Sequence, residues 1–150
     1  MKLFSRLKEQ GGAAIVEFAI AAPFLALLAA GVAEFGIGYY AKAQVTAAAQ
    51  TGLRYAYANG FNSTNISSAV TGSTTQLTVS ASPAPRQYCG CVASNVVVES
   101  VCTGTNSCAN GDKPRTYVSV SASATYTPTI RLPGTPSSYA LTSTAQGRLD

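Results

Sequence analysis

The sequence contains no histidine, no tryptophan and few charged residues. Charged residues make up 11% of the chain and apolar residues 47%, whereas about a quarter of an ordinary soluble domain is charged. Without histidine, a nucleophilic serine lacks its usual base, and Lys42 or Lys113 is left as a formal candidate for a lysine base. The carboxylates also lie far apart in unlike contexts. The sequence therefore predicts a structural protein without a cofactor, and not an enzyme.

The positive charge is not arranged for nucleic-acid binding. The formal net charge is +4, but Lys2, Arg6 and Lys8 account for three of the ten basic residues, and the others are scattered singly. No stripe of lysine and arginine exists that a phosphate backbone could follow. Low charge and high apolar content indicate instead a membrane protein or a polymer subunit, and 150 residues are enough for one modest domain.

Four cysteines, Cys89, Cys91, Cys102 and Cys108, all lie in the distal half of the chain. The gaps between them are one, ten and five residues, whereas a zinc site of four thiolates needs pairs with about two to four residues between them. No metal site is therefore predicted, and the cysteines indicate disulfides in an oxidising compartment. A Cys89–Cys91 ring would be strained, so each of these two is expected to bond to Cys102 or Cys108.

Residues 1–12 are polar and basic, and an apolar run follows them. From Phe18 to Ala41 the 24 residues carry one charge, that of Glu34. As a helix this stretch is about 36 Å long, enough to cross roughly 30 Å of hydrocarbon. Three basic residues precede it and only Lys42 follows closely, so the positive-inside rule places the N-terminus in the cytoplasm and the rest outside.

An amphipathic stretch extends this helix beyond the membrane. Between Lys42 and Ala58 polar residues recur at every fourth position, and apolar residues form a stripe beside them. The predicted helix runs from about Ala13 to Ala58 and stops at Asn59-Gly60. At about 70 Å it is far longer than a bilayer needs, so its outer half must pack on something else.

The rest of the chain predicts a small antiparallel sheet. Residues 61–75 are rich in Asn, Ser, Thr and Gly and indicate a loop or a weak helical turn. Strand signals follow at 77–82, 95–101 and 116–126, with a weaker one at 139–149. The clearest is 116–126, where one face carries valine, alanine and tyrosine and the other mostly serine. The predicted fold class is α+β, a lollipop of one long N-terminal helix and a sheet held by disulfides.

Two other interpretations of the N-terminal run are open. A secretory signal peptide has a basic start, a short apolar core and small residues before its cleavage site, and "AGVA", which ends at Ala33, would serve as that site. Glu17 and Pro23 interrupt such a core, however. The chain could also be a single-pass membrane protein whose outer domain binds a ligand or another envelope protein. The first residue of the mature chain discriminates between these interpretations.

Three motifs give the N-terminal third a family resemblance. "GGAAIVEF", "AEFG" and "GLRYA", set in an alanine-rich helix, resemble the TadE-like pseudopilins of tight-adherence (Flp/Tad) pili, a branch of the type IV pilin superfamily. The resemblance is close from Gly12 to about Arg54 and looser in the terminal strands. It implies a minor pilin or pseudopilin, a structural component of a Tad-type pilus that primes or caps assembly for surface adherence.

The resemblance also implies proteolytic processing. A prepilin peptidase would cleave after Gly12 on the cytoplasmic side and release Ala13 as the first mature residue. Counted from Ala13, Glu17 takes the fifth position, where pilins carry a glutamate, and it would set the register between subunits. Type IV pilins commonly have phenylalanine where this chain has Ala13, and major Flp pilins have tyrosine where it has Phe18. Both departures favour a TadE-like component.

The resulting domain organisation has three parts. Residues 1–12 are the leader, residues 13–59 the long helix whose first half spans the membrane, and residues 60–150 an extracytoplasmic β domain. The implied partners are a prepilin peptidase, other pilins and an inner-membrane assembly platform. The implied location is the bacterial inner membrane, and afterwards the pilus or cell surface.

Two more positions in the helix are candidate functional residues. Pro23 lacks an N–H and would free the carbonyl of Ala19, which allows a kink. Glu34 is expected near the outer membrane interface, either as a solvated carboxylate or paired with Lys42 or Arg54 of another subunit.

Overall fold

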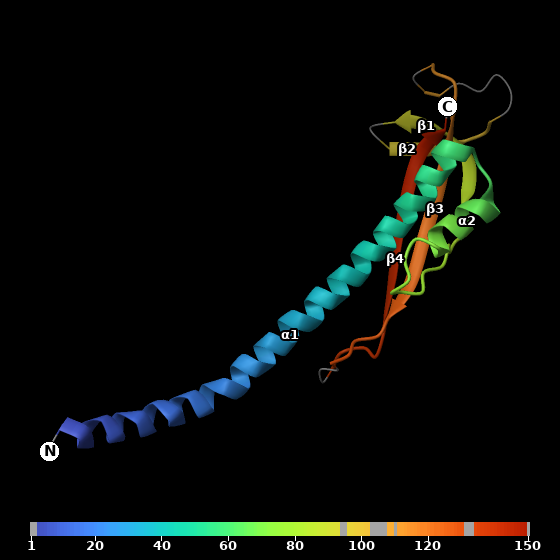
Figure 1. Ribbon diagram of the computed structural model, residues 1–150. Helices are drawn as coiled ribbons and strands as arrows, with labels where there is room; N and C mark the ends of the chain where they lie inside the picture. The colour runs from blue at the N-terminus through green and yellow to red at the C-terminus, as the bar shows by residue number, and fades with distance from the viewer. Residues whose placement is uncertain (1–2, 94–95, 103–107, 110, 131–133, 150) are drawn as a thin grey trace.

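The computed structural model describes residues 3–93, 96–102, 108–109, 111–130 and 134–149, with side chains from residue 12 onward except that of Ala13. Two helices and four strands follow one another along the chain (Figure 1). They are α1 (Leu3–Asn59), α2 (Ser63–Thr71), β1 (Arg86–Ala93), β2 (Val96–Ser100), β3 (Arg115–Tyr126) and β4 (Tyr139–Leu149).

The first helix dominates the shape of the molecule. α1 has 57 residues, which corresponds to about 85 Å at the usual helical rise. It begins at Leu3, ten residues before the predicted start, so the helix also includes most of the expected leader. It ends where Gly60 adopts φ 79° and donates its N–H to the carbonyl of Ala56 at 2.9 Å. A left-handed glycine after the last turn is a common helix stop.

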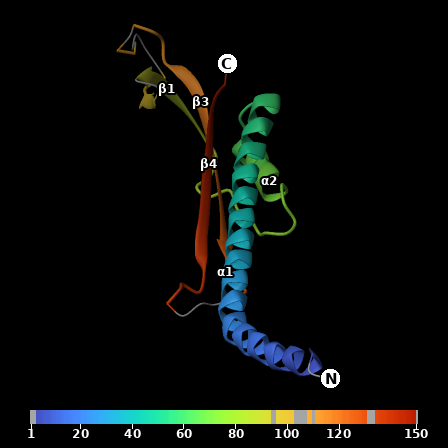
Figure 2. The same cartoon turned by 90° about the vertical axis from the view of Figure 1, so that its left-hand side faces the viewer.

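The four strands form one antiparallel sheet in the order β2-β1-β3-β4. β3 and β4 pair along almost their whole length, from Thr116 opposite Leu149 to Tyr126 opposite Tyr139. The sheet lies against the C-terminal half of α1, while the N-terminal half projects alone (Figures 1 and 2). The predicted α+β class, with one long helix and a disulfide-bonded antiparallel sheet, is confirmed.

The core lies between α1 and one face of β3. Val118, Val120 and Ala122 of β3 are fully buried, as are Val45 and Ala49 of α1. Most of these side chains are small, so the helix and sheet approach each other closely. The inward face that the alternation in 116–126 predicts is therefore found, although Ser119 and Ser121 on the other face are also buried.

A second helix, which the sequence indicated only as a weak turn, completes the core. α2 begins after Asn62, whose side chain accepts a hydrogen bond from the N–H of Asn65 at 3.1 Å. This is a standard N-cap interaction. Ile66 and Val70, one turn apart, are fully buried against α1. α2 and α1 form one layer and the sheet forms the other (Figure 2).

The strands differ from the prediction at two places. The signal at 77–82 yields only an isolated bridge between Ser80 and Ser123, because Pro83 and Pro85 follow and cannot donate to a ladder. β1 occupies a stretch where no strand was predicted. β4, predicted as the weaker strand, has eleven residues.

Two disulfides fasten the end of the sheet that lies farthest from the N-terminus of the chain (Figure 1). Cys89 is bonded to Cys102 and Cys91 to Cys108. This is one of the two cross-pairings that the sequence left open. Both bonds attach segments near β2 to β1, where the sheet has the least cover from α1.

Candidate functional site

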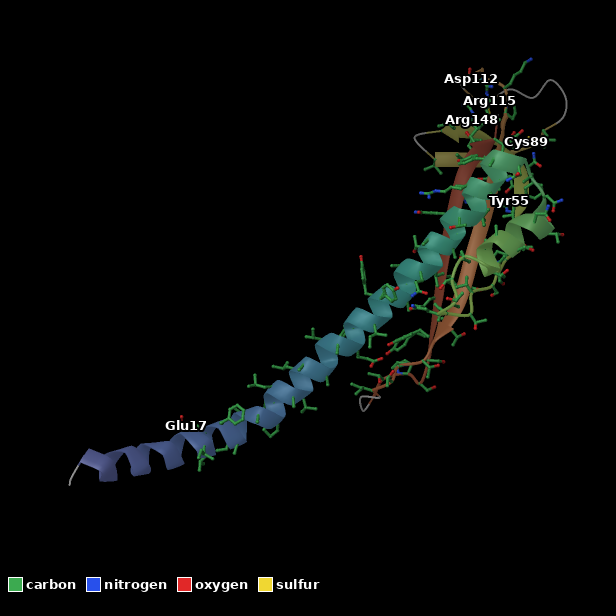
Figure 3. All side chains as sticks on the ribbon, in the orientation of Figure 1. Glu17, Tyr55, Cys89, Asp112, Arg115 and Arg148 are labelled. Carbon is green, nitrogen blue, oxygen red and sulfur yellow. A yellow bond between two sulfur atoms is a disulfide. The ribbon has the colours of Figure 1, made fainter. Side chains whose placement is uncertain are left out.

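The exposed N-terminal half of α1 is the most unusual surface of the molecule. From residue 14 to residue 40 no side chain is buried, and the first buried residue is Ala41. Phe18, Phe24 and Leu28 are exposed by 66 to 68%. Side chains project on all sides of this half of the helix (Figure 3). It is long and apolar enough to cross a membrane, and a soluble monomer does not normally expose so large an apolar surface.

Glu17 is the single charged residue between Gly12 and Ala33. It is exposed and lies far from the sheet (Figure 3). The backbone of Gly12 and Ala13 is helical, so Glu17 follows Ala13 by one turn on the same side. The structure of the single chain leaves the roles of these residues in processing and register as predictions.

Pro23 lies inside α1 and does not interrupt it. Its missing N–H leaves the carbonyl of Ala19 without its helical donor. α1 changes direction in its N-terminal part, drawn in blue, which includes this proline (Figures 1 and 2). A proline is the usual cause of such a change in a helix.

Glu34 connects α1 to the end of the sheet. Its Oε1 atom accepts the hydroxyl hydrogen of Tyr126 at 2.5 Å and the N–H of Thr129 at 3.1 Å. Its Oε2 atom accepts the N–H of Ile130 at 3.1 Å. The sequence predicted a solvated carboxylate or a pair with another subunit. Within the single chain both oxygens accept hydrogen bonds from donors of the same chain, because the segment after β3 folds back on α1. The pairing with another subunit stays a prediction.

The contact with Glu34 changes the pKa of Tyr126, and a second polar contact between α1 and the sheet lies farther along the helix. The hydrogen bond to the Glu34 carboxylate raises the pKa of Tyr126 to about 12, since ionising the phenol would break the bond and place two negative charges together. Two turns along α1, the ammonium group of Lys42 donates to the carbonyl of Thr142 on β4. These two polar contacts join α1 to the β3–β4 pair.

A groove of about 320 Å³ opens beside the Glu34 contact. α1 contributes Gly31 and Gly38 to its wall, and the segment between β3 and β4 contributes Pro128 and Ile130. A side chain at position 31 would meet nothing within 4 Å. The groove is therefore open and predominantly apolar, with the Glu34 carboxylate as its polar part.

The contact of Glu34 with the β3–β4 segment also limits the length of α1 that is free of the sheet on all sides. From about residue 31 onward, the β3–β4 end of the sheet lies beside the helix. Residues 13–30, the free segment, are about 27 Å long and match the roughly 30 Å of a hydrocarbon core. The predicted span, residues 18–41, overlaps the part of α1 beside the sheet over residues 31–41, nearly half of its length.

Arg54 is exposed near the C-terminal end of α1, twenty residues beyond Glu34. This is about 30 Å along the helix, so the two residues of one chain are too far apart to pair. Their pairing between subunits stays a prediction. Among the residues that the structure describes, no group of three or more His, Cys, Asp or Glu side chains could hold a metal ion.

Together these features describe an α+β protein with a candidate membrane anchor followed by a sheet domain. Residues 12–54 match the model of the family described as TadE-like protein, which confirms the resemblance given by the motifs over this stretch. The match lies wholly within α1 and does not extend to the sheet. Neither the curated proteins nor the solved structures gave a match.

Proposed function

We propose that this protein is a minor pilin or pseudopilin, a non-enzymatic structural component of a Tad-type pilus. Residues 1–12 are the leader, and a prepilin peptidase removes them between Gly12 and Ala13. The free segment, residues 13–30, anchors the subunit in the inner membrane with the sheet domain on the extracytoplasmic side. Other pilins and an inner-membrane platform are its partners, and it primes or caps the assembly.

The exposed apolar half of α1 is the observation that carries this proposal. It buries no side chain in the single chain and belongs to the TadE-like match, and between residues 14 and 33 it contains one charged side chain, Glu17. Glu17 lies one helical turn after Ala13, at the beginning of the apolar segment. A plain anchor has no use for a carboxylate there, because a charge inside the span is costly, about 2.5–3.5 kcal/mol where it reaches the centre.

Cleavage gives Glu17 a partner. It removes Lys2, Arg6 and Lys8 and leaves an ammonium group on Ala13. An ammonium ion enters an apolar bundle only if it is paired, and the Glu17 carboxylate of a neighbouring subunit provides the pair. The start of the mature helix also favours an anion through its dipole.

The mass of the mature protein tests the processing step. We expect the intact mass and N-terminal sequence of protein purified from its native host to begin at Ala13. A chain that still begins at Met1 would contradict processing, and one that begins at Glu34 would identify a signal peptide instead. A variant with Gly12→Leu, which blocks the small-residue cleavage site, should keep its leader.

The register role of Glu17 is tested separately. We expect Glu17→Ala to insert in the membrane at the normal level but to be lost from sheared or purified pili, because the new Ala13 amine has no counter-ion. Glu99→Ala is the matched control, since this glutamate pairs with Arg86 at the sheet surface at 2.9 Å and lies far from the free segment of α1. Pili that contain Glu17→Ala and Glu99→Ala equally would rule out the register role.

A further inference from the structure

We propose that the end of the sheet domain nearest the free segment is a lipid-contacting surface that rests on the extracytoplasmic leaflet. This surface, called the rim here, consists of Val32 and Phe35 on α1, Ile130 in the connection between β3 and β4, and Tyr139, the first residue of β4. The inference rests on the proposed membrane anchoring and deepens it, because it assigns a second membrane contact outside the helix.

The rim is exposed and apolar. Phe35 is 82% exposed, Val32 73%, Ile130 41% and Tyr139 39%. Single exposed apolar residues are ordinary, but a cluster of them marks a contact surface. Two of these residues come from the helix and two from more than ninety residues further along the chain. They come to one level because Glu34 holds the N–H groups of Thr129 and Ile130.

The polar groups at the rim suit an interface with lipid. Backbone groups in contact with lipid need partners within the protein, and the N–H groups of Thr129 and Ile130 have theirs in Glu34. The carboxylate itself accepts three hydrogen bonds, so it meets the interface already paired. Tyr39, one turn beyond Phe35, is 79% exposed and adds an aromatic side chain of the kind enriched at membrane surfaces.

The position of the rim, directly after the free segment along α1, favours lipid as its partner over a second copy of the chain. The free segment ends at Ala30, and the rim begins with Val32, so the apolar surface is continuous from the span into the headgroup layer. A second copy of the chain is the other candidate partner. A stable protein contact buries about 1,200–2,000 Å², which four side chains cannot supply alone, whereas an interfacial contact with lipid needs only an apolar edge and aromatic residues.

Single tryptophans can measure this contact, because the chain has none. The full chain is reconstituted in phosphatidylcholine vesicles whose acyl chains carry bromine either near the glycerol or near the middle. Ile130→Trp reports on the rim, and Phe24→Trp on the free segment. Val98→Trp on β2 is the matched control, because it is an exposed apolar residue near the disulfide-bonded end of the sheet. Phe35→Trp reports on the rim without altering the β3–β4 connection.

We expect Ile130→Trp and Phe35→Trp to lose fluorescence chiefly with bromine near the glycerol, Phe24→Trp chiefly with bromine near mid-chain, and Val98→Trp with neither. Quenching of Phe24→Trp without quenching of Ile130→Trp would overturn the rim contact and leave the anchor intact. Absence of quenching at Phe24→Trp would overturn the anchor itself, and the rim contact with it. A blue shift at Ile130→Trp that follows protein density and ignores bromine would assign the rim to a second copy and overturn the lipid assignment.

Discussion

Gly52 shows how tightly single residues control the core. A Cβ atom at this position would lie 2.5 Å from Cγ2 of Val70 and 2.8 Å from Cγ1 of Val120. We expect Gly52→Ala to destabilise the fold by about 1–3 kcal/mol, as overpacking generally does. Gly36→Ala is the control, because its Cβ meets nothing within 4 Å and alanine favours the helix. Urea unfolding of both variants in detergent measures the difference, and equal midpoints would contradict the close contact.

Tyr126 reports on the contact between α1 and the sheet. Its pKa of about 12 lies above the usual value of about 10. A raised pKa means that the neutral phenol stabilises the fold below about pH 10, and that this contribution is lost as the pH rises through about 12. Tyrosinate absorbance of the full chain at about pH 11 should therefore be lower than in Glu34→Gln, where Tyr126 titrates near its usual value. Identical titration curves would show that the hydrogen bond does not form in solution.

At the scale of elements, the disulfides stabilise the strand that has the least other support. β2 pairs only with β1, and it ends two residues before Cys102. Closing a loop of this size is worth about 3 kcal/mol. We expect Cys89→Ser with Cys102→Ser to lower the free energy of unfolding by about that amount and to speed hydrogen exchange of β2 amides selectively. Unchanged protection of β2 relative to β3 would contradict this.

The elements also show what sequence patterns can predict. β3 was predictable because its Val118-to-Ala124 face alternates with serine. β1 was missed because Gly90 and two cysteines interrupt the alternation. The structure shows that Gly90 fits the strand, since a Cβ atom there would lie 2.4 Å from Cγ1 of Val97 on β2. α2 was predicted only as a loop or a weak helical turn, because its Ser and Thr content resembles a loop. Ile66 and Val70, four apart after the Asn62 cap, were the available signal.

The candidate site divides in the same way. The apolar run and Glu17 depend on neighbouring residues in the chain, so local patterns identified them. The partners of Glu34 lie more than ninety residues away, at the end of β3 and in the segment that follows it. No local pattern indicates that this segment folds back on α1. The position of the rim and the shortened free segment follow from that long-range contact and therefore required the structure.

The whole molecule consists of two parts that share one helix but not one core. Every buried side chain that the structure describes lies at or beyond Ala41, and the candidate membrane anchor consists of residues that bury nothing. The sheet domain should therefore not depend on the free segment for its stability. It should depend on the part of α1 that supplies Val45 and Ala48.

Two truncated chains test this independence. A chain that begins at residue 31 keeps Glu34 and the whole core, so we expect it to be soluble, to form both disulfides and to unfold within about 0.5 kcal/mol of the full chain, as after surface changes. A chain that begins at residue 50 loses Val45, Ala48 and Ala49, all fully buried, and should not fold. Thermal unfolding followed by circular dichroism compares them. A large loss of stability in the longer fragment would mean that the free segment packs on the domain, and that the two parts form a single cooperative unit.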